Sequence, residues 1–163
     1  MRYSIVYSSQ TGNTALLAET VRASLPPADC IYYGAPSAAA LKADRIYLGF
    51  WTDKGICDNA VAAFLKTLTH QQVFLFGTAG FGPAGGYHQK ILDRVSDMLP
   101  DTVTVIGRYL CQGKMPMSVR TRYELLLESG VPHAEDLLDN FDEALSHPDE
   151  RDLQVLRDAV RIF

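Results

Sequence analysis

Three short segments of this chain are apolar almost without interruption, and longer amphipathic segments separate them. The three segments are residues 3–7, 45–50 and 73–76. A strand that helices cover on both faces has no wet side, so its sequence loses the alternation of polar and apolar residues. These segments therefore predict the central strands of a parallel sheet.

Two further segments, residues 30–33 and 103–110, complete a set of five expected strands. Helical periodicity lies between the strands, and several of these segments begin or end close to a proline. Strands that alternate with helices, joined by right-handed crossovers, give an α/β fold with helices on both faces of a five-stranded parallel sheet. The expected helices are residues 14–25, 58–68, 87–99, 118–128, 134–145 and 149–162.

The composition fits one globular domain spanning residues 1–163. The chain is 47% hydrophobic and 21% charged, so it can bury a core. No apolar run reaches the ~18 residues of a membrane span, and the first residues enter a strand directly, which leaves no room for a signal peptide. Three cysteines without a C-x-x-C pair predict reduced thiols. We expect a cytoplasmic protein with no membrane or nucleic-acid partner.

The segment SSQTGNT, residues 8–14, joins the first strand to the first helix. It lacks the Gly-Lys-Ser/Thr of a nucleoside-triphosphate loop and the three glycines of a dinucleotide loop. The hydroxyls of Ser9, Thr11 and Thr14, with N–H groups at the helix start, can satisfy a phosphate monoester, and Gly12 allows close approach. A plain polar helix cap is the alternative.

The same segment resembles the phosphate loop of the flavodoxin family, [ST]-x-T-G-x-T. The resemblance covers residues 1 to about 110 and implies a flavodoxin-like three-layer sandwich, with sheet order 2-1-3-4-5 and FMN at the carboxyl edge of the strands. Residues 51–58 and 77–87 stand where the family carries the loops that sandwich the isoalloxazine ring. The implied FMN-binding residues are Ser9, Gln10, Thr11, Gly12, Asn13, Thr14, Trp51, Thr52, Asp53, Lys54, Gly55, Thr78, Ala79, Gly80, Phe81, Gly82 and Tyr87.

Phosphoacceptor receiver domains are a competing interpretation with the same topology. Asp53, Thr78 and Lys114 occupy places comparable to the functional residues of receivers. Receivers also need an acidic pair after the first strand to hold Mg²⁺, and Ser8 and Ser9 stand there instead. A phosphatase of this topology needs C-x5-R, which the sequence lacks, and the histidines are isolated. We therefore expect no metal site and no catalytic side chain.

The last third of the chain exceeds a minimal flavodoxin. Residues 111–163 predict a helical C-terminal extension, expected to cover one face of the sheet. The phrases CQGKMP, FWTDKG and NFDEALSHPDE resemble the small flavodoxin-like companions of bacterial bilirubin reductase. This resemblance implies an electron carrier whose redox partner is a reductase acting on a bilin. The alternative is an FMN-dependent NAD(P)H:acceptor oxidoreductase, because a nicotinamide can stack on an exposed flavin without any motif.

Charge is distributed unevenly along the sequence. Residues 124–163 carry eleven acidic and three basic side chains, a net charge of −8, whereas residues 1–123 carry +4. Like-signed groups near the flavin edge would steer an oppositely charged partner. We therefore expect four basic side chains to form a cluster that docks an acidic surface of a reductase or attracts a substrate's carboxylates, while the acidic helices face away. These side chains are Lys54, Lys114, Arg120 and Arg122.

Overall fold

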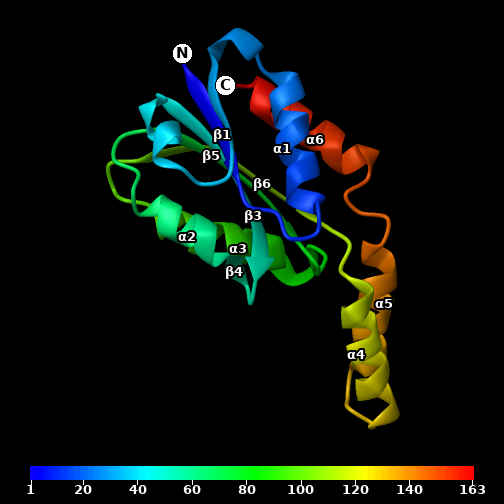
Figure 1. The fold of residues 1–163 in the computed structure, drawn as a ribbon. Coiled ribbons are helices and arrows are strands. Elements are labelled where there is room, and N and C mark those ends of the chain that lie inside the picture. Colours follow the sequence, from blue (N-terminus) through cyan, green and yellow to red (C-terminus); the bar gives the residue numbers. More distant parts are fainter.

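The structure, a computed structural model, describes residues 1–163 and places one parallel sheet between two layers of helices (Figure 1). The strands are β1 (Tyr3–Tyr7), β2 (Cys30–Gly34), β3 (Arg45–Asp53), β4 (Ile56–Cys57), β5 (Gln72–Ala79) and β6 (Thr104–Gln112). The α-helices are α1 (Asn13–Ser24), α2 (Asn59–Leu65), α3 (Tyr87–Ser96), α4 (Met117–Glu128), α5 (Ala134–Ala144) and α6 (Glu150–Arg161). Short 3-10 turns lie at Pro27–Asp29, Ala38–Lys42 and Ala84–Gly86.

The parallel strands lie in the order β2-β1-β3-β5-β6, which is the predicted order once the short strand β4 is set aside. The sequence analysis missed β4, because β3 runs on to Asp53 where a loop was expected. A two-residue turn at Lys54 and Gly55, with φ of 52° and 82°, folds the chain back so that Thr52 pairs with Cys57. Positive φ at both turn positions matches the right-handed twist of a hairpin.

Alternate residues of the central strands supply two separate cores. Val6 and Leu48 point to the face covered by α2 and α3, whereas Ile5, Tyr47 and Phe74 point to the face covered by α1 and α6. Neighbouring side chains of a strand point to opposite faces, so one apolar run fills both cores. This geometry confirms the interpretation of the apolar segments as strands that are buried on both sides.

The C-terminal helices divide into two groups. Helix α6 packs beside α1, with Leu156 and Val160 fully buried against the sheet. The hydroxyl of Tyr109 on β6 donates to the carbonyl oxygen of Asp152 over 2.7 Å and fixes the start of α6. The expectation that the extension covers one face of the sheet is therefore correct for α6.

That expectation is wrong for α4 and α5. These two helices pack on each other and project away from the sheet as a helical hairpin, residues 117–144 (Figure 1). Four buried residues of the hairpin lie outside both cores of the sheet: Tyr123, Ala134, Phe141 and Ala144. The apolar faces of α4 and α5 pack against each other. The helical pattern in the sequence therefore does not reveal whether each helix packs on the sheet or on another helix.

The predicted basic docking cluster is also divided by this arrangement. Arg120 lies on α4, where its Nε is 3.1 Å from Asp142 Oδ1 on α5 and its Nη1 contacts Glu124. Its charge is therefore paired inside the hairpin.

No helix combines the length and the apolar character that crossing a bilayer requires.

Candidate functional site

The predicted phosphate loop closes on one of its own hydroxyl groups. Ser9 Oγ accepts hydrogen bonds from the N–H groups of Gly12 and Ala15, each over 3.2 Å. Gly12 has φ of 92°, in the left-handed region that glycine adopts without steric cost. The loop enters α1 directly afterwards, so its remaining amides lie at the N-terminus of a twelve-residue helix.

The three hydroxyl residues of the loop have different positions. Thr14 is buried, and its Oγ1 lies 3.2 Å from the carbonyl oxygen of Phe50 and 3.1 Å from Thr78 Oγ1, so it ties α1 to β3 and β5. Thr11 is exposed and lines a cavity. The N–H groups of Thr11, Asn13 and Thr14 make no hydrogen bond within the chain. These free donors can bind an anion.

Two small cavities flank this loop at the carboxyl edge of the sheet. One measures about 80 Å³ and the other about 250 Å³, and they share Thr11, Asn13 and Lys114. Thr52 lines the smaller cavity, and its Oγ1 is buried without a hydrogen-bond partner. Neither lining includes an acidic residue, so the donor set suits a phosphate group. The smaller cavity is lined by Gln10, Thr11, Asn13, Trp51, Thr52, Thr78, Ala79, Gly80, Gly113, Lys114, Met115 and Pro116.

The segment after β6 was not among the predicted FMN-binding residues, yet it forms one wall of the smaller cavity. Asn13 Nδ2 donates to the carbonyl oxygen of Lys114 over 2.8 Å, so an amide of the phosphate loop holds this segment in place. A Cβ at Gly113 would lie 2.6 Å from Asn13 Nδ2, which explains the glycine. Its position in the sequence could have indicated this role, because the segment follows a parallel strand and so leaves the same edge of the sheet as the other loops.

The loop after β5 lines both the smaller cavity and an open groove. Ala79 and Gly80 line the smaller cavity, while Phe81, Gly82 and Tyr87 line an open groove of about 770 Å³ beside α5. The rings of Phe81 and Tyr87 meet edge to face with their centroids 6.1 Å apart. Burial raises the pKa of Tyr87, against the opposing charge of Arg94, so its phenol stays protonated at neutral pH.

The turn between β3 and β4 lies apart from these cavities. None of Asp53, Lys54 and Gly55 lines either cavity or the groove. The carbonyl oxygen of Gly55 accepts a hydrogen bond from Arg94 Nη1 over 3.0 Å, which anchors the turn to α3. Trp51, three residues before Lys54, lines the smaller cavity.

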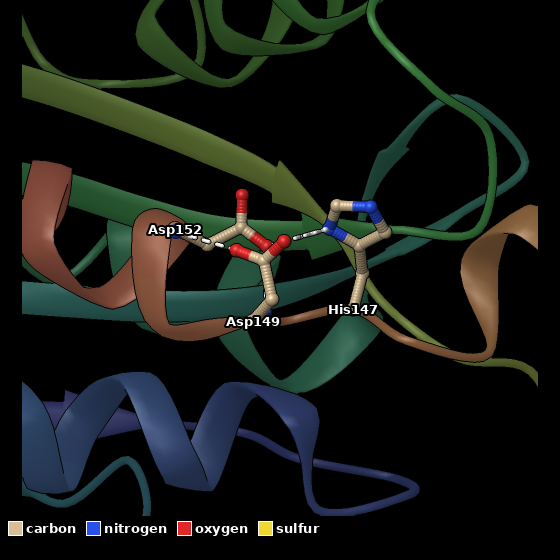
Figure 2. A group of neighbouring side chains, drawn as sticks. All are labelled: His147, Asp149 and Asp152. Atoms are coloured by element: carbon tan, nitrogen blue, oxygen red, sulfur yellow. Dashed lines mark hydrogen bonds and ion pairs between the residues drawn. The ribbon is translucent and has the colours of Figure 1, made fainter.

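Three titratable side chains gather where α6 begins (Figure 2). His147 Nδ1 lies 2.6 Å from Asp152 Oδ2, and one ligand atom from each of His147, Asp149 and Asp152 falls within 4.8 Å of the others. Asp149 and Asp152 form a capping box, each side chain accepting from the other's N–H over 2.9 and 2.8 Å. The pKa of Asp149 is lowered mainly by the hydrogen bond from the N–H of Asp152, and the charge of His147 lowers it further. Helix capping accounts for the cluster.

The strand order and the lysine-free hydroxyl loop at the carboxyl edge define the class of this protein: a doubly wound α/β protein with a flavodoxin-type phosphate loop. The family model described as "Flavodoxin domain" matches residues 4–161. The chain belongs to the flavodoxin family, as the phosphate loop predicted.

Two curated relatives carry the same description, "Flavodoxin-like domain-containing protein BilS". The chain is 37% identical to the one from Clostridium symbiosum and 30% identical to the one from Clostridioides difficile. Each match covers 94% of this chain and 90% of the relative. The chain therefore matches these relatives over nearly their whole length, and the subfamily resemblance of the sequence is confirmed.

Solved structures share the fold at lower identity. A short-chain flavodoxin associated with a non-canonical PDU bacterial microcompartment has a TM-score of 0.55 at 21% identity, covering 86% of this chain and 99% of that one. A flavoprotein from Lactobacillus acidophilus, solved in complex with FMN, has a TM-score of 0.52 at 17% identity, covering 68% of this chain and 93% of that one. Family membership agrees with the FMN cofactor predicted from the sequence.

Proposed function

We propose that this protein binds FMN and carries electrons to a partner reductase. The observation that carries the proposal is the cavity beside the phosphate loop, where free amides, Thr11 and the unpartnered Oγ1 of Thr52 converge without any acidic neighbour. A terminal phosphate monoester matches this donor set. Membership of the flavodoxin family favours FMN over FAD, and one structural neighbour of this fold was solved with FMN bound.

In this proposal the chain supplies binding, orientation and electrostatics. The flavin, when bound, supplies one- and two-electron transfer. Thr11 and the amides at the start of α1 hold the phosphate, and Lys114 adds a nearby cation. Trp51 and Gly80 line the smaller cavity, and Phe81 and Gly82 line the open groove. No side chain acts as a proton donor or nucleophile.

The relatives' name BilS supports an accessory role in bilirubin reduction, with electrons passed to a bilirubin reductase. An FMN-dependent NAD(P)H:acceptor oxidoreductase remains the second candidate. The open groove of about 770 Å³ beside Phe81 and Tyr87 favours it, because a nicotinamide could stack there on an exposed ring face. The two candidates differ in whether NAD(P)H reduces the bound flavin directly.

The first experiment identifies the cofactor. Purified protein should be yellow, and heat should release FMN, identified by chromatography against FAD. Colourless protein whose apo form does not quench added FMN fluorescence would contradict the proposal.

The second experiment separates carrier from enzyme. The FMN-loaded protein is mixed anaerobically with NADH or NADPH in a stopped-flow instrument. Persistent oxidised flavin, followed by reduction and reoxidation in the presence of a bilirubin reductase, supports the carrier. Rapid bleaching by NADH or NADPH alone would replace the carrier with the oxidoreductase.

A further inference from the structure

The carbonyl oxygen of Gly80 is held by two side chains from different parts of the chain. Gln112 Nε2, at the end of β6, donates to it over 3.0 Å, and Asn140 Nδ2, on α5, donates over 3.1 Å. Gln112 Nε2 also lies 3.1 Å from Asn140 Oδ1, which closes the network. Gln112 is 6% exposed, so water does not compete well for these bonds.

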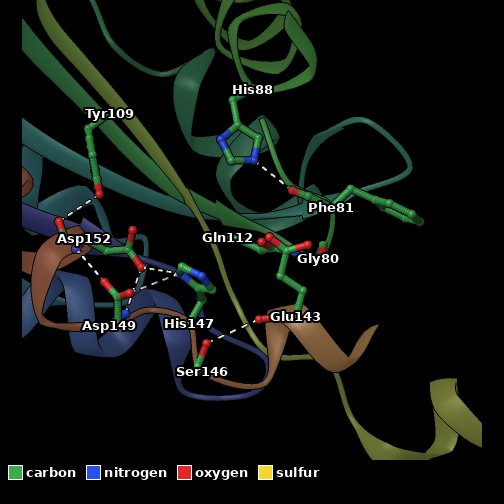
Figure 3. Close-up of polar contacts among 10 residues, drawn as sticks. All are labelled: Gly80, Phe81, His88, Tyr109, Gln112, Glu143, Ser146, His147, Asp149 and Asp152. Carbon is green, nitrogen blue, oxygen red and sulfur yellow. Dashed lines mark hydrogen bonds and ion pairs between the residues drawn. The ribbon is translucent and has the colours of Figure 1, made fainter. Parts of the chain in front are cut away.

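The next carbonyl along the loop is held as well. His88 Nε2, on α3, lies 2.8 Å from the carbonyl oxygen of Phe81 (Figure 3). A carbonyl oxygen can only accept, so this ring nitrogen carries the proton. Two successive peptide groups of the loop are therefore fixed from outside by side chains of α3, β6 and α5.

Fixing a carbonyl also fixes the amide that shares its peptide plane. In a planar trans peptide the N–H points opposite to the C=O. With the Gly80 oxygen turned to Gln112 and Asn140, the N–H of Phe81 faces away from α5. Because the Phe81 oxygen is turned to His88, the N–H of Gly82 points away from His88. Neither N–H makes a hydrogen bond within the chain, so both stay available to a ligand.

The neighbouring packing leaves the loop little freedom to adopt another arrangement. Met115 packs directly on Gly80, where an added Cβ would lie 2.6 Å from its Sδ. Side chains thus contact the loop from several elements, while the N–H groups of Phe81 and Gly82 have no partner within the chain. Asn140 belongs to the helical hairpin, so the projecting hairpin contributes one member of this network.

We propose that Asn140 is a positioning residue of the flavin site: with Gln112 it holds the Gly80 carbonyl so that the Phe81 amide is presented to the polar edge of the isoalloxazine ring. This inference rests on the proposed function. The helical hairpin then contributes to the cofactor site through Asn140, which fixes the position of Gly80. A partner that moves the hairpin would also act on the flavin.

The test compares Asn140→Asp with Asp139→Ala. Aspartate keeps the shape of asparagine but cannot donate to Gly80, and its charge faces a carbonyl oxygen. Asp139 is the exposed neighbour on the same helix and serves as the matched control. FMN affinity is measured by flavin fluorescence, and the potentials of bound flavin by anaerobic redox titration.

Asn140→Asp should weaken FMN binding about three- to tenfold, the size of one net hydrogen bond. It should also shift a one-electron potential by up to about 59 mV, the equivalent of a tenfold change in affinity between two redox states. Asp139→Ala should leave both unchanged. The double variant Asn140→Asp, Gln112→Glu should lose less than the sum of the single losses, because both act on one carbonyl oxygen.

Two outcomes overturn the inference. One is an Asn140→Asp protein whose affinity and potentials match those of Asp139→Ala. The other is an affinity loss with unchanged potentials and a lower unfolding temperature of the apo form, which would mean a general packing role. In both cases wild-type protein that binds FMN leaves the proposed function standing, whereas wild-type protein without FMN binding would remove the proposed function itself.

Discussion

The layered body and the helical hairpin are built from similar amphipathic helices but bury them differently. In the body, α1 and α6 share one core with the sheet, and α2 and α3 share the other. In the hairpin, α4 and α5 bury a small core of their own around Phe141. Large side chains remain on its surface, with Met117 62% and Leu125 58% exposed. The body holds the proposed cofactor site, and the hairpin stands beside the body.

Charge separates the two regions as clearly as packing does. The hairpin carries seven acidic and two basic side chains, a net charge of −5, and Arg120 is already paired within it. Exposed acidic and apolar groups on one projecting element are suited to meet a basic protein surface, and two copies of the hairpin would repel each other. The difference teaches that the proposed site lies between regions of opposite charge: Lys114 lines the two small cavities, and the acidic hairpin lines the open groove.

The largest expected effect concerns the phosphate loop. Thr11→Asp places a carboxylate where the phosphate is expected, and repulsion of about 4 kcal/mol for two unit charges roughly 4 Å apart at an effective dielectric near 20 would weaken FMN binding about a thousandfold. Thr121→Asp, an equivalent change on the exposed surface of α4, should leave binding unchanged. Fluorescence titration with FMN measures both. Full flavin retention by Thr11→Asp would argue that this loop is only a polar helix cap.

The second prediction compares the core of the body with the small core of the hairpin. Phe76→Ala removes a fully buried ring from the sheet and should lower the free energy of unfolding by about 3–5 kcal/mol. Phe141→Ala removes an equally buried ring from the hairpin, so it should loosen the hairpin while the body stays folded. Denaturant unfolding and limited proteolysis distinguish the two.

Cleavage confined to residues 117–144 is expected for Phe141→Ala. Equal losses of global stability in the two variants would show instead that hairpin and body unfold as one cooperative unit.

The sequence predicted the body well because its constraints are local and periodic. Residues 3–7 and 73–76 are apolar on both faces, which few structures other than a covered strand explain. The loop at residues 8–14 was predicted from its residues alone, and Gly12 has the positive φ that a close turn before α1 requires. The two-residue strand β4 was missed because β3 had been ended before Trp51.

The hairpin could not be placed from the sequence because its pattern states only that each helix has an apolar face. Phe141 fits a sheet-covering helix and a paired helix equally well, and the partner surface is a tertiary property. Arg120 was assigned to the body for the same reason. The hydrogen bond between Asn140 and Gly80 joins residues sixty positions apart. A pattern within a short stretch of sequence cannot predict such a contact.

The third prediction tests whether Lys114 serves the site. Lys114 lines both small cavities, so Lys114→Gln should weaken FMN binding by about two- to fivefold at low salt, the range of an exposed charge pair. Arg122→Gln removes an exposed cation from the hairpin and should have no effect. The difference should shrink at high salt, when the screening length falls below about 10 Å. Equal affinities at low salt would assign Lys114 to partner docking instead.

The smallest expected effect belongs to Lys54, which lies at the turn between β3 and β4. It is exposed and outside the cavities, so its field reaches the flavin largely through solvent. Two unit charges 4 Å apart interact by about 1 kcal/mol in water, and a more distant lysine contributes less. Because a cation favours the reduced anion, Lys54→Gln should lower the hydroquinone potential by less than about 40 mV. Redox titration at low and high salt measures this shift, which added salt should abolish; a larger shift that survives high salt would place Lys54 against the ring.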